Sequence, residues 1–437
     1  MTPSPTAPPA GSINHPPVYT LGLLLSLYVA QGLPAGFVTQ ALPAILRQYD
    51  VSLGLIGLSG FLLLPWAFKF VWAPVVDGHY SARMGQGRTW ILPLQLVAAA
   101  LVALIACVDP TRLADPAVLW PFFALLFVLN IVGATQDVAS DGLAVRMLNH
   151  NQRHWGNAIQ VIGYRFGLIV GGGLLLLALG WVGWSAVFLL MSLMIVLNTL
   201  PIWRFREPVW PHSVKLQTTH QTVPWLTRFA VQFGYFWQSP TMRAWLLVLL
   251  VFKIADGLSS SMVKPMMVDM GYQLEQIGLL ASVVGSASSL LGAGLAAWLM
   301  RYISRYRALL TFNALQAGAT GLYAWAAWQF AQQGKPTLWL VFGANAVEHV
   351  VASMALVALL TIAMDYARPE RAGSDFTFQV CMMSLVGGTG HLLSGYLAQS
   401  VGYTTHFMIS AVIGVILLVP IIKWGQQSCL SSLTRVN

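Results

Sequence analysis

Eight side chains with acid–base or charge-binding chemistry lie inside strongly apolar stretches of this 437-residue chain. Groups of this kind are costly in hydrocarbon surroundings, so they usually face a cavity, pair with one another or serve transport. We therefore predict that they contact a small-molecule substrate or take up coupling protons. The eight residues are Lys69, Asp137, Asp141, Tyr164, Arg165, Lys253, Asp256 and Glu348.

Asp137 and Asp141 are four residues apart, which places both carboxyl groups on one face of a helix. Two neighbouring carboxylates disfavour simultaneous ionisation, particularly when they are buried. A site that gains and loses a proton during transport needs this property. The structural alternative is that Asp141 caps the end of its helix or pairs with nearby Arg146.

The basic residues in apolar stretches need anionic partners. Lys69 lies too deep for an ordinary interfacial residue, so it either extends along its own helix or holds a substrate anion or a carboxylate. Arg165 is always charged, and Asp137 is its natural partner within the protein. Lys253 and Asp256 are three residues apart and can pair along one helix.

Glu348 and His349 are adjacent in another apolar stretch, where both side chains can take up protons. A neutral, hydrogen-bonded His349 in the core is the alternative, and the same holds for His391. The chain contains no phosphate-binding G-x-x-x-x-G-K-[ST] loop, no H-E-x-x-H and no G-x-S-x-G. Its three cysteines form no C-x-x-C pair. We therefore predict no enzyme, no catalytic residue, no cofactor and no metal site.

Composition indicates the kind of element that holds these residues. Hydrophobic residues make up 57% of the chain and charged residues 8%, against about 25% charged in a soluble domain. Mean hydropathy is +0.68. So few charges cannot solvate the surface of a large water-soluble globule, which excludes that class. The net charge of +9 comes from basic residues in the gaps between apolar runs, which is typical of membrane topology and not of nucleic-acid binding.

Twelve apolar runs are long enough to cross a bilayer at about 20 residues per span. They predict an all-α polytopic membrane protein with twelve transmembrane helices in two six-helix halves. The runs are 18–45, 53–75, 89–108, 118–141, 157–178, 181–202, 243–264, 276–299, 308–331, 337–364, 376–397 and 405–424.

The predicted organisation has five parts and a defined orientation. A disordered tail covers 1–17, the first half 18–202, a linker 203–242, the second half 243–424 and a final tail 425–437. Basic residues are concentrated in the loops on the linker's side, which the positive-inside rule assigns to the cytoplasm. Both termini are therefore predicted to be cytoplasmic.

Two glycine series mark faces where helices approach closely. One series is spaced by four residues in the fifth run and the other by seven in the eighth. We predict that they are sliding surfaces between the halves, with static packing inside one half as the alternative. The glycines are Gly163, Gly167 and Gly171, and Gly278, Gly285 and Gly292.

Several short strings together resemble the AmpG-like branch of the major facilitator superfamily. This branch comprises muropeptide permeases, acetyl-CoA transporters and importers of siderophores such as rhizobactin and pyochelin. The resemblance implies the major facilitator fold, a proton-driven secondary carrier and the bacterial cytoplasmic (inner) membrane. The strings are Gln31-Gly32-Leu33-Pro34, the run from Phe68 to Asp77, Gln136-Asp137 with Asp141, the run from Gly163 to Gly167, and the run from Lys253 to Asp256.

Within this branch, the segment from Met364 to Gln379 looks more like the siderophore importers. Muropeptide permeases often carry extra helices after the twelfth, and this chain ends soon after Lys423. The sequence therefore favours a proton-coupled importer of a ferric siderophore. A permease for muropeptides or another amphipathic anabolite is the first alternative, and a non-transporting membrane receptor or sensor is the second.

The chemistry of a bulky, aromatic and anionic cargo of this kind indicates roles for particular residues. Lys69, Arg165 and Lys253 would hold the charge of an anionic cargo, and Tyr164 with nearby aromatic side chains would pack on its rings. Core packing or lipid contact is the alternative for each aromatic residue. The loop after the second run keeps part of the superfamily's gating pattern, in Asp77, Arg83 and Arg88.

Overall fold

The computed structural model describes residues 16–208, 225–273, 276–277, 283–334, 336 and 338–433. Almost all of the predicted tail 1–17, residues 209–224 of the predicted linker, and Gly278 lie outside these residues. Every regular element within them is a helix. The all-α prediction is therefore confirmed for the described part of the chain.

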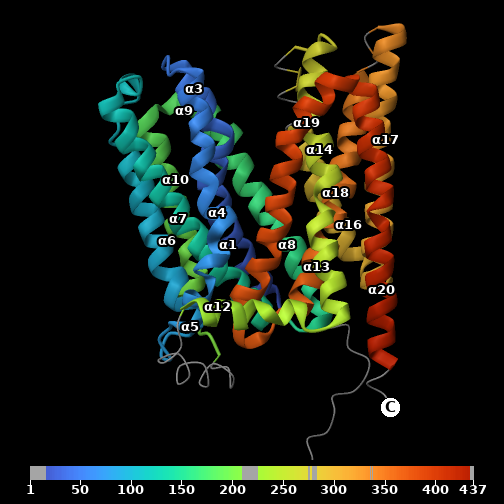
Figure 1. The fold of residues 1–437 in the computed structure, drawn as a ribbon. Helices are drawn as coiled ribbons and strands as arrows, with labels where there is room; N and C mark the ends of the chain where they lie inside the picture. The colour runs from blue at the N-terminus through green and yellow to red at the C-terminus, as the bar shows by residue number, and fades with distance from the viewer. Residues whose placement is uncertain are drawn as a thin grey trace, which may run out of the picture.

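The helices form two bundles that stand side by side (Figure 1). The bundles converge at the end where helix α12 (Trp225–Gly234) and the C-terminal part of α20 (Leu418–Leu433) lie, and they diverge toward the opposite end. We call these the linker end and the far end. Helix α20 continues to Leu433, so most of the predicted tail 425–437 is helical.

The first bundle extends from α1 to α10. Its elements are α1 (Val18–Gly36), η1 (Phe37–Ala41), α2 (Leu42–Gln48), α3 (Leu53–Leu58), η2 (Ser59–Leu63), α4 (Leu64–Phe68), η3 (Lys69–Val71), α5 (Ala73–Gly78), α6 (Gln86–Ile105), η4 (Pro110–Arg112), α7 (Pro116–Met147), η5 (His150–Gln152), α8 (Arg153–Ile169), η6 (Val170–Leu174), α9 (Leu175–Val182) and α10 (Trp184–Arg204).

The second bundle follows α12. Its elements are η7 (Tyr235–Trp237), α13 (Pro240–Phe252), α14 (Ile254–Asp269), α16 (Gly285–Leu299), α17 (Arg305–Gln333), α18 (Leu338–Tyr366), η9 (Pro369–Arg371), α19 (Ala372–Ile416) and α20. Helix α19 includes a kink at Gly402, whose φ is 74°.

Eight helical segments in the described residues are long and apolar enough to cross a membrane. Each of these segments overlaps a predicted run. The second run is instead broken into short elements, and the runs 376–397 and 405–424 are covered by α19 and α20. The chain is thus a multi-pass helical protein. The count of twelve, divided into six and six, stays a prediction.

The second predicted run is broken because prolines interrupt it. Pro65 and Pro74 each begin a new short helix, since a proline lacks the N–H that would continue the preceding turn. The 3₁₀ turn η3, which begins at Lys69, lies between these helices. The sequence therefore places Lys69 at an irregular point of the backbone.

Two wide π-helical segments of the first bundle face each other. Segment η1 follows Pro34 in α1, and η6 contains three consecutive glycines. A Cβ at Gly171 would lie 1.9 Å from the carbonyl oxygen of Leu33, and one at Gly172 would lie 2.5 Å from Gln40 Oε1. Glycine is therefore needed at both positions, because any side chain would overlap Leu33 or Gln40.

The prediction that the glycine series slide between the halves is wrong for the described residues. Gly163 and Gly167 pack on α1 of the same bundle, and Gly171 packs on Leu33 of that helix. Gly285 and Gly292 face α18 of their own bundle. Spacing identified faces of close approach, but it carried no information on which helix each face meets.

We predict that Gly167→Ala destabilises the first bundle. A Cβ at this position would lie 2.6 Å from both Gly32 Cα and Val29 O, so α1 and α8 must separate. The expected result is a loss of about 1–3 kcal/mol of stability, seen as a lower unfolding temperature in detergent. Gly173→Ala is the matched control, because nothing lies within 4 Å of its Cβ. Equal unfolding temperatures for the two variants would contradict this packing.

Candidate functional site

A buried ion pair joins η3 to α7. Lys69 Nζ pairs with Asp137 Oδ2, and the two residues are 3% and 7% exposed. The ammonium also lies 5.4 Å from the ring of Trp66. Lys69 therefore has a carboxylate partner inside the protein, and does not extend along its own helix to the membrane surface.

Asp141 lies on the same helix and receives hydrogen bonds from two other helices. The hydroxyl of Tyr28 in α1 donates to Asp141 Oδ1 over 2.9 Å, and Gln160 Nε2 in α8 donates over 3.0 Å. Asp141 is 1% exposed. The alternative in which Asp141 pairs with Arg146 is wrong, because Arg146 lies instead 3.9 Å from Asp77 and from Glu207.

Arg165 does not pair with Asp137, contrary to the prediction from sequence. Asp137 is taken by Lys69, and Arg165 makes no ion pair within the described residues. Helix α8, which carries Arg165, instead contacts α18 of the second bundle, which carries Glu348 and His349. The neighbouring Tyr164 is half-buried on α8. Sequence spacing cannot reveal this cross-bundle proximity.

The second bundle holds the pair that the sequence predicts within one segment. Lys253 Nζ lies 2.6 Å from Asp256 Oδ2, and Gln316 Nε2 in α17 donates to the other carboxyl oxygen over 3.0 Å. Lys253 separates α13 from α14 and has φ −94° and ψ 1°. Both paired lysines therefore stand where a helix is interrupted, the buried Lys69 in the first bundle and the half-buried Lys253 in the second.

Glu348 is buried in α18, at 6% exposure. The adjacent His349 contacts α16, where its ring packs against Gly285 and its Nδ1 lies 3.4 Å from Ser289 Oγ. His349 is therefore held by its surroundings as a core histidine would be. The four acidic residues predicted for proton coupling thus occupy separate places, with Asp137 and Asp141 in one bundle and Asp256 and Glu348 in the other.

Among the predicted gating residues, Asp77 crosses from one bundle to the other. Its carboxylate accepts hydrogen bonds from Ser374 N over 2.6 Å, Ser374 Oγ over 2.7 Å and Gly373 N over 3.3 Å. These donors form the first turn of α19, where unpaired N–H groups favour a negative charge. Burial raises the pKa of Asp77, while Arg146 and Ser374 oppose that effect.

Arg83 and Arg88 do not join the bundles. Arg83 is exposed. Arg88 Nη2 donates to the carbonyl of Trp203 over 2.9 Å, and its backbone N–H donates to Glu207 over 3.0 Å. Arg88 therefore ties α6 to the end of α10 within the first bundle. Glu207 accepts hydrogen bonds from backbone N–H groups at the start of α6, and no pattern in the sequence predicted this role.

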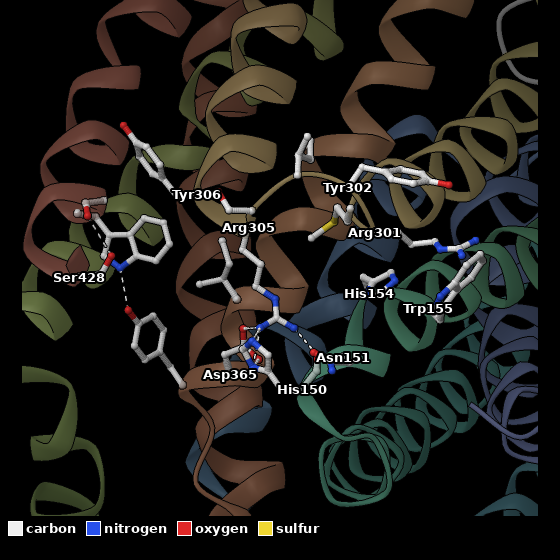
Figure 2. Close-up of a pocket in the computed structure, with 17 residues that line it drawn as sticks. His150, Asn151, His154, Trp155, Arg301, Tyr302, Arg305, Tyr306, Asp365 and Ser428 are labelled. Carbon is white, nitrogen blue, oxygen red and sulfur yellow. Dashed lines mark hydrogen bonds and ion pairs between the residues drawn. The ribbon is translucent and has the colours of Figure 1, made fainter. Parts of the chain in front are cut away.

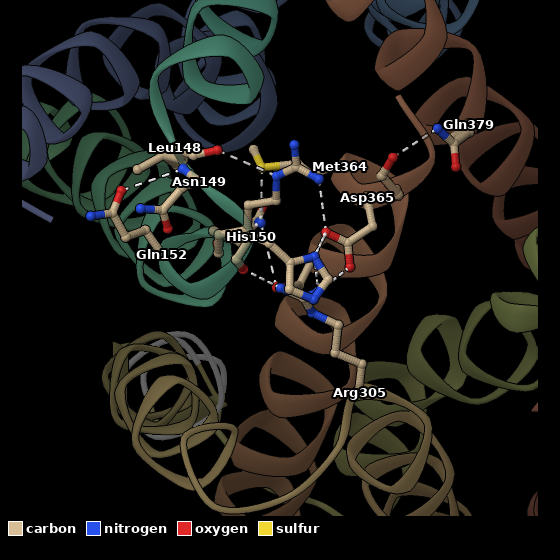
Figure 3. A network of polar contacts seen from close by, with 12 residues as sticks. Leu148, Asn149, His150, Gln152, Arg305, Met364, Asp365 and Gln379 are labelled. Atoms are coloured by element: carbon tan, nitrogen blue, oxygen red, sulfur yellow. Dashed lines mark hydrogen bonds and ion pairs between the residues drawn. The ribbon is translucent and has the colours of Figure 1, made fainter. Parts of the chain in front are cut away.

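A second carboxylate between the bundles was missed from sequence. Asp365 at the end of α18 lies 2.8 Å from Arg153, 2.5 Å from Arg305 and 3.2 Å from His150 (Figure 3). Arg153 and His150 come from the first bundle. The sequence showed these cations only as basic residues in loops, and their common partner depends on the folded arrangement. We call these four residues the Asp365 cluster.

Deeper between the bundles, Cys381 of α19 meets the second predicted run. Its Sγ lies 3.6 Å from the carbonyl oxygen of Trp66, and the residue is fully buried. Cys107, in contrast, is exposed. The burial of Cys381 thus depends on the two bundles staying together.

Two family models match different parts of the chain. The model for acetyl-coenzyme A transporter 1 matches residues 20–179, and the model for the major facilitator superfamily matches 254–427. An anhydromuropeptide permease of Escherichia coli K12 is 27% identical over 91% of this chain and 78% of its own length. A putative transporter AmpG 4 of Rickettsia conorii is 22% identical over 91% and 94%.

Solved structures show the same fold. The transporter FucP in its outward conformation has a TM-score of 0.70 at 14% identity, covering 93% of this chain and 99% of its own. An outward-facing bacterial homologue of the iron transporter ferroportin has a TM-score of 0.65 at 16% identity, covering 94% and 100%. These likenesses support the fold of the major facilitator superfamily. The siderophore importers that the sequence strings suggested find no counterpart among these relatives.

We predict that Asp137→Leu is much more damaging than the double change Lys69→Met with Asp137→Leu. The single change leaves a buried ammonium without its partner, at an expected cost of about 3–5 kcal/mol, whereas the double change removes both charges. The measurement is the unfolding temperature in detergent. Lys264→Met, at an exposed lysine of α14, is the control. A single variant as stable as the double variant would show that the pair does not hold these helices.

We also predict that Asp365→Asn opens the linker end. Losing the carboxylate leaves Arg153 and Arg305 facing each other, and a charge-assisted contact is worth about 1.5–3 kcal/mol. The alkylation rate of Cys381 should then rise about tenfold or more relative to Cys107, measured by peptide mapping. Asp115→Asn, at an exposed surface pair with Arg112, is the control. An unchanged Cys381 rate would mean that other contacts keep the bundles closed.

Proposed function

We propose that this membrane transporter of the major facilitator superfamily imports an amphipathic cell-wall anabolite of the muropeptide type. The cargo would be a sugar joined to a short peptide, carried by alternating access across the bacterial cytoplasmic membrane. The similarity to the anhydromuropeptide permease supports this cargo because it extends over 91% of the chain. This similarity therefore favours a muropeptide cargo, which the sequence offered as an alternative, over a ferric siderophore.

The observation that carries the proposal is the set of buried charged groups in both bundles. Lys69 with Asp137, and Lys253 with Asp256, hold two opposite charges each at positions inside apolar segments. Charged groups are costly inside a bilayer, so those that are found there usually serve a function. An anionic cargo that displaces either carboxylate from its lysine would gain a ready cation.

Proton coupling follows from the same pairs. A carboxylate released from its lysine becomes an uncompensated buried charge, and uptake of a proton removes that cost. Cargo binding to Lys69 would thus promote protonation of Asp137, with Asp141 four residues away as a second acceptor. Lys253, Asp256 and Glu348 would take the corresponding part in the second bundle, and Arg165 of the first bundle would be a further cation for the cargo. Binding of one solute then drives uptake of the other.

Release on one side requires the linker end to open, and we assign that end to the cytoplasm. The basic loops predict this orientation. Asp77 on the first turn of α19 and the Asp365 cluster would act as the closed gate in the state described here. Both carboxylates must leave their partners before cargo can pass. Arg83 and Arg88 would then support the gating loop without bridging it.

Ferric siderophore import is the second candidate, on the strength of the segment from Met364 to Gln379. The two cargoes are separated by uptake into spheroplasts with and without the protein, under an imposed proton gradient. Labelled anhydromuropeptide and iron-labelled siderophore are supplied in parallel. Accumulation of the muropeptide that collapses with a protonophore supports the proposal, and accumulation of iron alone overturns it. Binding without accumulation of either would indicate a receptor.

We predict that Asp137→Asn abolishes gradient-driven uptake of the cargo but keeps exchange of labelled for unlabelled cargo. An asparagine cannot carry the coupled proton, yet it still fills the space beside Lys69. Uptake should fall at least about tenfold, while exchange stays within about twofold of wild type. Asp269→Asn is the control, because this carboxylate lies at the surface and accepts from Tyr403. Unchanged gradient-driven uptake would remove Asp137 from the coupling mechanism.

A further inference from the structure

A large pocket at the linker end lies between the bundles, next to the proposed gate, with which it shares His150, Arg305 and Asp365. Its volume is about 1010 Å³. One wall comes from η5 and the start of α8, and the others come from the turn between α16 and α17 and from the ends of α18 and α20 (Figure 2). The pocket is therefore complete only while the two bundles are joined at this end.

The walls carry more positive than negative charge. Arg301 and Arg305 line the pocket, and Asp365 is the acidic residue among the described lining residues. That carboxylate is already shared between Arg305 and Arg153. Arg301 makes no ion pair within the described part of the chain and lies over the ring of Tyr302, at 5.7 Å. Both Nη atoms of Arg305 already contact Asp365 or His150, so Arg301 supplies the donors for a further anion.

The geometry favours a phosphate group. Arginine presents a planar fork of donors that matches phosphate oxygens, and the fork of Arg301 has no carboxylate partner within the described residues. Figure 2 shows Arg301 extending toward Trp155 on the opposite wall, while Arg305 points to Asp365. Helix α17 also begins at this wall, so its first N–H groups add positive partial charge.

An apolar stripe leads from the interior of the membrane to the rim of the pocket. Leu291, Leu295 and Trp298 of α16 are spaced by four and three residues, and Tyr302 follows four residues later. All are exposed, at 61%, 36%, 49% and 67%. In a bilayer such a face contacts lipid, and an aromatic pair at its end is typical of the membrane–water interface. An acyl chain can therefore lie on the same face that ends at Arg301.

We propose that this pocket binds the headgroup phosphate of an anionic phospholipid, held by Arg301 with the positive charge of Arg305 in the same pocket, and with an acyl chain along the stripe Leu291–Leu295–Trp298–Tyr302. Because the lining comes from both bundles, the lipid binds the joined state better than a state in which the bundles have separated. A ligand shifts an equilibrium by its difference in affinity for the two states. Anionic lipid thus stabilises the closed linker end, whatever cargo the transporter carries.

The test is the unfolding temperature of the purified full-length protein in detergent, titrated with phosphatidylglycerol or phosphatidylcholine. Phosphatidylglycerol should raise Tm by about 2 °C or more, and phosphatidylcholine should not. In Arg301→Gln the midpoint lipid concentration should rise about tenfold, as expected for the loss of one charge-assisted contact. Arg301→Lys should lie between the two, because it keeps the charge without the fork.

Arg204→Gln is the matched control, since it removes an exposed arginine from the end of α10, outside the pocket. It should keep the wild-type midpoint. Equal weakening in Arg204→Gln and Arg301→Gln would reduce the effect to general surface charge and overturn the site. An equal rise in Tm with inorganic phosphate alone would replace the lipid by a soluble anion and overturn the proposed occupant. No rise with phosphatidylglycerol would overturn the proposal outright.

Discussion

A charge inside an apolar helix bundle must have a partner, and this constraint organises the molecule. Lys69 meets Asp137, and Lys253 meets Asp256, and each lysine stands where the backbone departs from a regular helix. Asp141 has no cation and is satisfied instead by hydroxyl and amide donors from two other helices. The cost of an unpaired buried charge thus decides how α1, α7 and α8 meet.

Helix α7 links the buried pairs to the contact between the bundles. It carries Asp137 and Asp141 in its middle, and Gly142 one residue further on approaches Gly373 of α19, where a Cβ would lie 3.0 Å from the glycine's backbone. Arg146, one turn later, faces Asp77 at 3.9 Å. A single helix that holds both regions connects the buried pair of Lys69 and Asp137 to the contact between the bundles.

The polar contacts between the bundles concentrate near the linker end. The Asp77 contact uses the first turn of α19, and the Asp365 cluster gathers cations from both bundles around one carboxylate. Hydrogen bonds to backbone N–H groups at a helix start and shared ion pairs can be broken and remade without disturbing a packed core. The glycine series of the fifth and eighth runs, for which sliding between the halves had been predicted, instead pack helices together inside each bundle.

The sequence by itself determined that this chain is a multi-pass helical membrane protein, because apolar length and a scarcity of charge are local properties. It also identified Lys69, Asp137, Asp141 and Glu348 as ionisable residues inside apolar stretches, and the pairing of Lys253 with Asp256, since a separation of three residues suffices to bring them together. Only the tertiary structure decided the other partners. Lys69 and not Arg165 faces Asp137, and Asp365 gathers Arg153 and Arg305, because those distances depend on how helices far apart in the chain pack. Neighbour relations across a bundle leave no periodic trace in the sequence, which is also why the glycine faces were found and their partners misassigned.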